Sequence, residues 1–134
     1  MDFQRLENFR YLKKAKEICE RQIREAIRSL GELTGVNLGG TPAGGNRLSV
    51  QERAVERLER LRRMYEYRLE RYQKELIEVE AFIDGIDNVL TQQVFILRFV
   101  KGYSWPKVAM EIGGGNTEDS VRKVCSRYLE KHGD

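Results

Sequence analysis

The chain has 134 residues, which is enough for one domain or for one small domain with an extension. Its 24 Lys and Arg against 21 Asp and Glu give a formal net charge of +3, which permits nucleic-acid binding without requiring it. One histidine and two cysteines exclude a zinc cluster and the disulfide framework of small secreted proteins. No apolar run has membrane-spanning length, and the charged first 16 residues do not form a signal peptide. We therefore expect a cytoplasmic protein without a membrane partner, metal or cofactor.

The first predicted element is an amphipathic helix from about residue 3 to residue 33. Its apolar residues recur at steps of three and four, which is the spacing of one helix face. The stripe consists of Phe9, Leu12, Cys19, Ile23, Ala26, Leu30 and Leu33, and Lys16 interrupts it. The outer face is basic, and we interpret it as solvated rather than as a contact surface.

Residues 34–47 are predicted to be a flexible hinge, because they contain five glycines and a proline. A long helix follows, with Ser49 and Glu52 forming a capping box at its start. Its seam is Val55, Leu58, Tyr65, Leu69, Tyr72, Leu76, Val79, Ile83, Ile86 and Leu90, broken only at Arg62. An isolated stripe of this length cannot stay exposed, so the first helix or a second copy of the chain must cover it. The sequence thus predicts a coiled-coil-like antiparallel hairpin over residues 1–85, with a weak point at Asp84-Gly85.

Residues 86–134 are predicted to form a separate helical domain of three short helices. The first contains the apolar block at residues 94–100 and ends at Lys101-Gly102. Ser104 caps the second helix, Pro106 occupies its first turn, and glycines 113–115 end it. The third begins at Asn116 or Thr117 and buries Val121, Val124, Cys125 and Tyr128. A short helix, a tight turn and a helix with a polar, basic outer face are typical of a helix-turn-helix.

The stretch ILRFVKGYSWPKVAMEIGGGNTEDSVRKV resembles region four of bacterial sigma factors. It is more similar still to phage and prophage proteins with a sigma-like helix-turn-helix, the ArpU/RinA-type late transcription regulators. The matching features are LRFVKGYSW, KVAMEIGG and NTEDSVRK. The resemblance implies transcription control, with double-stranded DNA as partner and RNA polymerase as a further one. The chain lacks the second sigma domain that binds the melted promoter, so it does not replace a sigma factor unless the hairpin supplies polymerase contacts.

The third short helix is the expected reader of DNA. Its candidate base contacts are Asn116, Thr117, Glu118, Asp119, Arg122 and Lys123; Ser126 lies on the same outer surface; and Arg127 and Lys107 are expected to hold phosphates. Glu118 and Asp119 either accept from cytosine or only favour the positive helix end.

Two other functions remain open at this point. A small terminase-like subunit for phage DNA packaging also joins a helix-turn-helix to an oligomerising helical segment. A helical interaction adaptor would keep the fold without contacting DNA. No enzyme is expected, because acidic residues on the long helix alternate with arginines as in a salt-bridged surface. The long seam also predicts a homodimer or a higher homo-oligomer.

Overall fold

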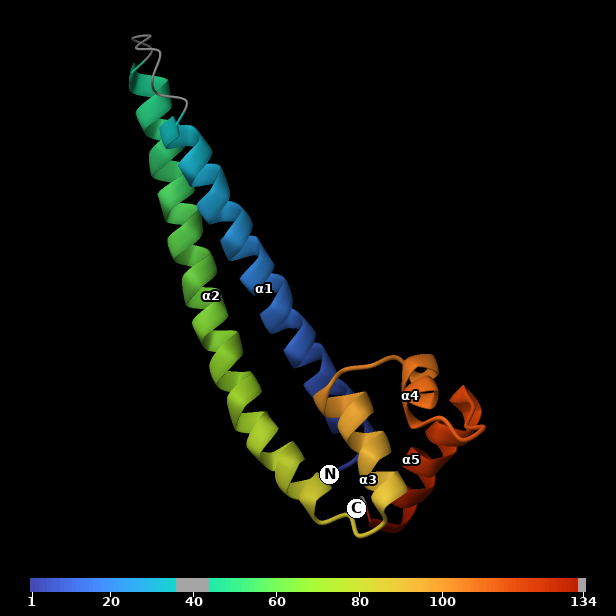
Figure 1. The fold of residues 1–134 in the computed structure, drawn as a ribbon. Helices are drawn as coiled ribbons and strands as arrows, with labels where there is room; N and C mark the ends of the chain where they lie inside the picture. The colour runs from blue at the N-terminus through green and yellow to red at the C-terminus, as the bar shows by residue number, and fades with distance from the viewer. Residues whose placement is uncertain (36–43, 133–134) are drawn as a thin grey trace. The chain divides into compact units, whose positions relative to one another are not determined.

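The computed structural model describes residues 1–35 and 44–132, which are almost entirely helical (Figure 1). The helices are α1 (Phe3–Gly35), α2 (Gly44–Asp84), α3 (Val89–Phe95), the π-helix η2 (Ile96–Val100), α4 (Trp105–Ile112) and α5 (Glu118–His132). No β-strand occurs within these ranges, so the predicted all-α class is confirmed.

Contacts divide the chain into two compact units. One unit consists of Met1–Lys13 with Arg71–Asp134, and the other is Lys14–Glu70. Both long helices therefore contribute to both units. The sequence instead suggested a hairpin over residues 1–85 followed by a domain over residues 86–134.

The unit Lys14–Glu70 is an antiparallel helix pair. Arg68 donates a 3.4 Å hydrogen bond to the backbone oxygen of Ala15, and the thiol of Cys19 lies 3.5 Å from the backbone oxygen of Leu61. Cys19 comes after Ala15 in α1, whereas its partner Leu61 comes before Arg68 in α2. The two helices therefore run antiparallel, as predicted. Cys19, Ala26 and Leu61 are the buried apolar residues of this unit.

Two details of the predicted α2 seam are wrong. The seam was expected to break at Arg62, but Leu61 turns inward at that point with 6% exposure while Arg62 is exposed. A step of three from Leu58 to Leu61 and of four from Leu61 to Tyr65 continues the stripe without a gap. Val55, a predicted seam residue, is 41% exposed.

The start of α2 also differs from the prediction. The helix begins at Gly44, so Ser49 and Glu52 lie inside it and cannot form the expected capping box. Glycine disfavours a helix by only about 1 kcal/mol per residue, which the rest of a long helix readily offsets. Of the predicted hinge, residues 34–35 and 44–47 are helical, and residues 36–43 lie outside the described part of the chain.

In the other compact unit the first turns of α1 pack antiparallel to the last turns of α2. The rings of Phe9 and Tyr72 stack with centroids 5.2 Å apart and planes inclined by 11°. Nearer the start of α1, Arg5 donates a 2.6 Å hydrogen bond to Glu75, which lies nearer the end of α2. The predicted antiparallel pairing therefore holds here as well.

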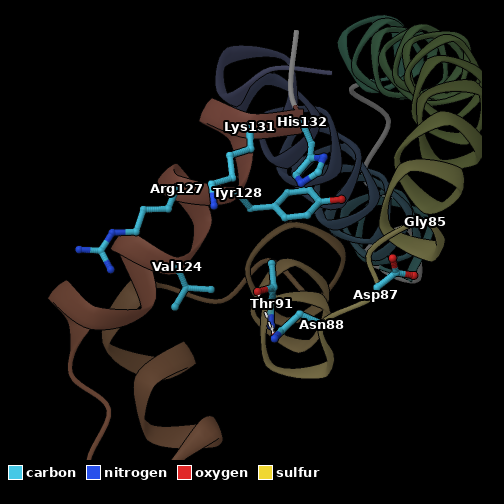
Figure 2. Close-up of a pocket in the computed structure, with 9 residues that line it drawn as sticks. All are labelled: Gly85, Asp87, Asn88, Thr91, Val124, Arg127, Tyr128, Lys131 and His132. Carbon is cyan, nitrogen blue, oxygen red and sulfur yellow. Dashed lines mark hydrogen bonds between the residues drawn. The ribbon is translucent and has the colours of Figure 1, made fainter.

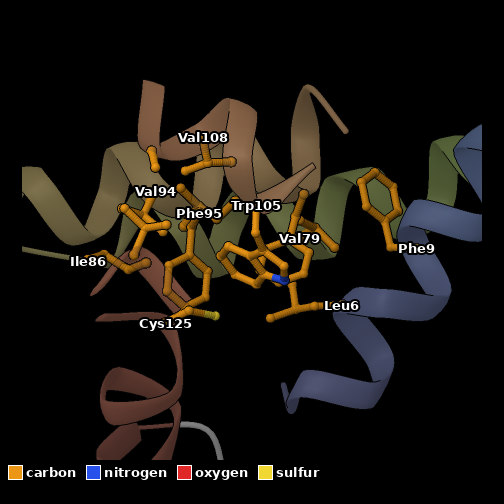
Figure 3. Close-up of a cluster of buried hydrophobic side chains, with 13 residues drawn as sticks. Leu6, Phe9, Val79, Ile86, Val94, Phe95, Trp105, Val108 and Cys125 are labelled. Carbon is orange, nitrogen blue, oxygen red and sulfur yellow. The ribbon is translucent and has the colours of Figure 1, made fainter. Parts of the chain in front are cut away.

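This unit has one continuous apolar core (Figure 3). The first turns of α1 and the last turns of α2 contribute to it together with every later helix. The buried members are Leu6, Phe9, Val79, Ile83, Ile86, Val94, Phe95, Phe99, Trp105, Val108, Ala109, Val121 and Cys125. The first helix therefore supplies part of the core that supports the C-terminal helices, and the predicted stripe missed Leu6.

The connection between α2 and α3 confirms the predicted weak point. α2 ends at Asp84, and α3 begins at Val89 with Asn88 as its N-cap. Ile86 is buried although it belongs to the linker, whereas Leu90, predicted on the seam, is 41% exposed. The change of direction at the linker ends the seam after Ile86.

Candidate nucleic-acid interface

The α4–α5 connection is short because its backbone turns sharply. The side chain of Ser104 accepts a hydrogen bond from the Lys107 amide and caps α4, as predicted. Residues 113–115 have φ values of 69°, 62° and 79°. A side chain would be strained in this left-handed region, which explains three successive glycines at the end of α4.

Thr117 is the residue that caps α5. Its Oγ1 accepts from the Ser120 amide at 3.1 Å, and the Ser120 Oγ accepts from the Thr117 amide at 2.9 Å. This reciprocal pair fixes the first turn of the helix. Asn116 instead closes the turn by donating from its side chain to the Gly113 backbone oxygen at 2.8 Å. Of the two predicted caps, Asn116 thus holds the turn and Thr117 the helix.

The two faces of α5 are clearly different. Val121 and Cys125 are buried, and Val124 and Tyr128 are partly buried, so the predicted inner face is confirmed. The predicted outer residues Glu118, Asp119, Arg122, Lys123, Ser126 and Arg127 are exposed. The structure therefore gathers these six residues on the outside of one helix.

Two of the predicted base-reading cations have acidic partners on their own helix. Arg122 lies 2.5 Å from Glu118, and Lys123 lies 2.9 Å from Asp119. All four side chains are about half exposed or more, so each pair contributes only about 0.3–0.5 kcal/mol. The pairs lower the local positive charge, yet they are weak enough to exchange for another partner.

The remaining predicted site residues differ in their surroundings. The ammonium of Lys107 lies 4.0 Å from the ring centre of Tyr103, and the Ser126 hydroxyl donates to the Lys123 backbone oxygen. Arg127 is exposed and makes no ion pair with any described residue. Lys107 lies on α4, apart from the others, which all lie on α5 or in the turn before it.

A buried charged cluster lies beside the start of α4, and it was not predicted from the sequence. Arg98 lies on η2 with only 8% exposure. It donates to Glu7 at 3.0 Å and to the Tyr103 backbone oxygen at 3.1 Å, and its guanidinium stacks over Trp105 at 4.3 Å. Glu7 also pairs with Arg10 at 3.1 Å. A lone arginine inside the apolar block at residues 94–100 was the available signal.

Arg98 lies within a π-helical turn. The Lys101 amide bonds to the Ile96 backbone oxygen, five residues back, at 2.9 Å. A π-turn holds one more residue than an α-turn and so rotates the side chains that follow. Burial lowers the pKa of Arg98 from its usual value, while the hydrogen bond with Glu7 opposes that shift. Arg98 thus joins the first helix to the loop before α4.

A pocket of about 580 Å³ opens between the start of α3 and the last turns of α5 (Figure 2). The linker and α3 contribute Gly85, Asp87, Asn88 and Thr91, and α5 contributes Val124, Arg127, Tyr128, Lys131 and His132. His132 stacks on Tyr128 with ring centroids 4.4 Å apart. Only Arg127 among these residues was a predicted site residue.

The two thiols are buried, as predicted, and burial raises the pKa of Cys125 to about 12. Among the described residues no group of three His, Cys, Asp or Glu side chains is arranged to hold a metal ion. None of the described helices combines the length and apolarity needed to cross a membrane.

A scan of the chain against protein-family models and searches of curated proteins and of solved structures gave no match.

Proposed function

We propose that the protein binds double-stranded DNA through α5 and acts in transcription control without being an enzyme. The observation that carries the proposal is the division of α5 into a buried apolar face and an exposed face with Arg122, Lys123 and Arg127. A helix that is anchored on one side and cationic on the other can enter the major groove. The glycine turn and the Thr117 cap give this helix a fixed start.

The roles of individual residues follow from their partners. Arg122 and Lys123 exchange their carboxylate partners for base edges, and bidentate contact with guanine suits an arginine best. Arg127 and Lys107 lack carboxylate partners among the described residues and contact phosphates. Glu118 and Asp119 repel phosphate and compete with DNA for Arg122 and Lys123, so they weaken binding to sequences that offer these two cations no base contact.

The assignment to transcription, and to phage or prophage genes, rests on the resemblance of residues 96–124 to sigma region four and to ArpU/RinA-type regulators. RNA polymerase is the further partner that this resemblance suggests.

The test begins with selection of bound DNA from a random library. Affinities of the parent, Arg122→Ala and Arg127→Ala for the preferred site and for a scrambled site are then measured across a salt series. Arg122→Ala should weaken binding to the preferred site by about 1–3 kcal/mol and relax the preference at one or two base pairs. Arg127→Ala should weaken both sites equally and reduce the salt slope by about one unit.

Circular dichroism provides the control for these variants. Both residues are exposed, so neither substitution should change the melting temperature. If both variants bind like the parent, α5 does not read DNA in this way.

One observation favours a second function, that of a protein-interaction adaptor. Met110 on α4 and Val89 on α3 are 79% and 71% exposed, so the same unit displays apolar side chains to solvent. An adaptor would bind its partner without the strong salt dependence of DNA binding. Absence of any salt-sensitive DNA binding by the parent would support this function instead.

A further inference from the structure

The pocket between α3 and α5 has a lining suited to an anion (Figure 2). Lys131 and Arg127 line one wall, one helical turn apart, and Asn88 and Thr91 line the other. Neither Lys131 nor Arg127 makes an ion pair with a described residue. All of these residues belong to the same compact unit.

The amide of Asn88 is held in one orientation. Its Oδ1 accepts from the Thr91 backbone amide at 3.0 Å and from the Thr91 hydroxyl at 3.2 Å. The oxygen is therefore occupied by the helix cap, and the Nδ2 group keeps its N–H donors for a ligand. No hydrogen bond from Nδ2 to a described residue is present.

We infer that this pocket holds a phosphodiester group of the bound DNA backbone, between Lys131 and the side-chain amide of Asn88. The inference rests on the proposed function and deepens it, because it assigns a backbone contact beside the base-reading surface. Arg127 belongs both to the exposed face of α5 that carries Arg122 and Lys123 and to the lining of the pocket, so a DNA backbone that runs along this face reaches the edge of the pocket. Phosphate contacts at the end of such a helix would fix its register in the groove.

Two lining residues define the limits of the site. In Figure 2 the Arg127 guanidinium extends outward from α5, away from Asn88 and Thr91, so it lies at the edge of the site. Asp87 is the acidic residue of the lining and opposes an anion. It is exposed and makes no hydrogen bond or ion pair with a described residue, so its charge opposes the anion without stabilising the fold.

The decisive substitutions change charge without removing the cap. Asn88→Asp keeps a side-chain oxygen for the Thr91 amide, and aspartate caps helices as well as asparagine does. It replaces the N–H donors with a negative charge, so DNA affinity should fall by about tenfold or more. Asn88→Ser keeps a cap without the charge and should cause a smaller loss. Asp87→Asn should increase the affinity, which a purely structural role would not predict.

Lys131 is tested through the salt dependence of binding. Lys131→Ala should reduce the slope of log affinity against log salt by about 0.9, because one fewer counterion is released. Lys14→Ala, an exposed lysine in the other compact unit, is the matched control and should leave the slope unchanged. Equal melting temperatures of the parent and Asn88→Asp show that the fold is retained.

The outcomes separate this inference from the proposed function. If the parent does not bind DNA, both fail. If the parent binds DNA but Asn88→Asp, Asp87→Asn and Lys131→Ala match the parent in affinity and salt slope, the pocket inference alone is overturned.

Discussion

The buried ion pair between Glu7 and Arg98 makes a sharp prediction about stability. Glu7 bridges two cations, with 3.0 Å to Arg98 and 3.1 Å to Arg10. The side chains of Glu7 and Arg98 are only 12% and 10% exposed, so water cannot replace the carboxylate charge. Glu7→Gln keeps the shape of the side chain and removes its charge. It leaves Arg98 buried without a counter-charge, which should reduce the free energy of unfolding by about 3–5 kcal/mol.

The matched control is the ion pair that joins α1 to α2. Arg5 and Glu75 are 2.6 Å apart, but their side chains are 46% and 25% exposed. Glu75→Gln removes the same charge from a solvated pair and should cost about 0–1 kcal/mol. Urea unfolding followed by circular dichroism at 222 nm measures both variants against the parent.

The double variant Glu7→Gln with Arg98→Met distinguishes the loss of the pair from the loss of the residue. Replacing both members of a buried pair with less polar side chains is often close to neutral. Arg98→Met gives up the stacking on Trp105, so recovery should be substantial but incomplete. Equal decreases in the free energy of unfolding for Glu7→Gln and Glu75→Gln would refute this prediction, because burial would then not change how much an ion pair stabilises the fold.

Three further predictions concern the register of α2, the buried thiol and the cap of α5. Leu61→Ala should destabilise by about 2–5 kcal/mol and the adjacent Arg62→Ala by less than about 0.5 kcal/mol in urea unfolding, because only Leu61 is buried. Because the folded-state pKa of Cys125 is raised from 9.0 to about 12, its contribution to stability is complete below pH 9 and is lost as pH rises towards 12. Unfolding measured at pH 8 and pH 10 should show a loss that is smaller in Cys125→Ala, and an undiminished loss in that variant would assign it to other groups. Thr117→Ala should lower the free energy of unfolding by about 0.5–2 kcal/mol, because the hydrogen bond with Ser120 is lost. An unchanged melting temperature would contradict this role of Thr117.

The helices could be predicted from the sequence wherever local chemistry determines them. Periodic apolar residues gave both long helices, and the antiparallel pairing followed from the need to cover them. Ser104 and glycines 113–115 marked the ends of α4, because capping and left-handed backbone depend on residue type alone. The buried face of α5 followed from four residues at helical spacing.

The features that the sequence did not reveal depend on contacts between distant residues. The Glu7–Arg98 pair spans most of the chain, and no local pattern relates a glutamate on the first helix to an arginine on η2. The π-turn that contains Arg98 has no periodic signature of its own in the sequence. Leu61 was overlooked because positions 61 and 62 both lie three or four residues from Leu58 and from Tyr65, so the spacing alone allows either one on the seam.

The candidate site was predicted as a set of residues but not as a surface. The exposed positions on α5 followed from its periodicity, whereas the i,i+4 pairing of Arg122 with Glu118 and of Lys123 with Asp119 required the side-chain geometry. Asn88 and Lys131 line the same pocket although they are far apart in the sequence, so no local pattern could relate them.

The core shared by Leu6, Phe9 and the C-terminal helices has a consequence for folding speed. Residues 1–13 are synthesised long before residues 71–132, yet they pack into one compact unit. Closing so large a loop costs chain entropy before the native contacts compensate for it, and proteins with such distant contacts fold slowly. During synthesis Phe9 cannot make its native contacts until Tyr72 and the later helices have left the ribosome, and until then it is exposed or covered by transient contacts. Refolding after rapid dilution from urea should therefore be slower than for helical bundles built from neighbouring segments.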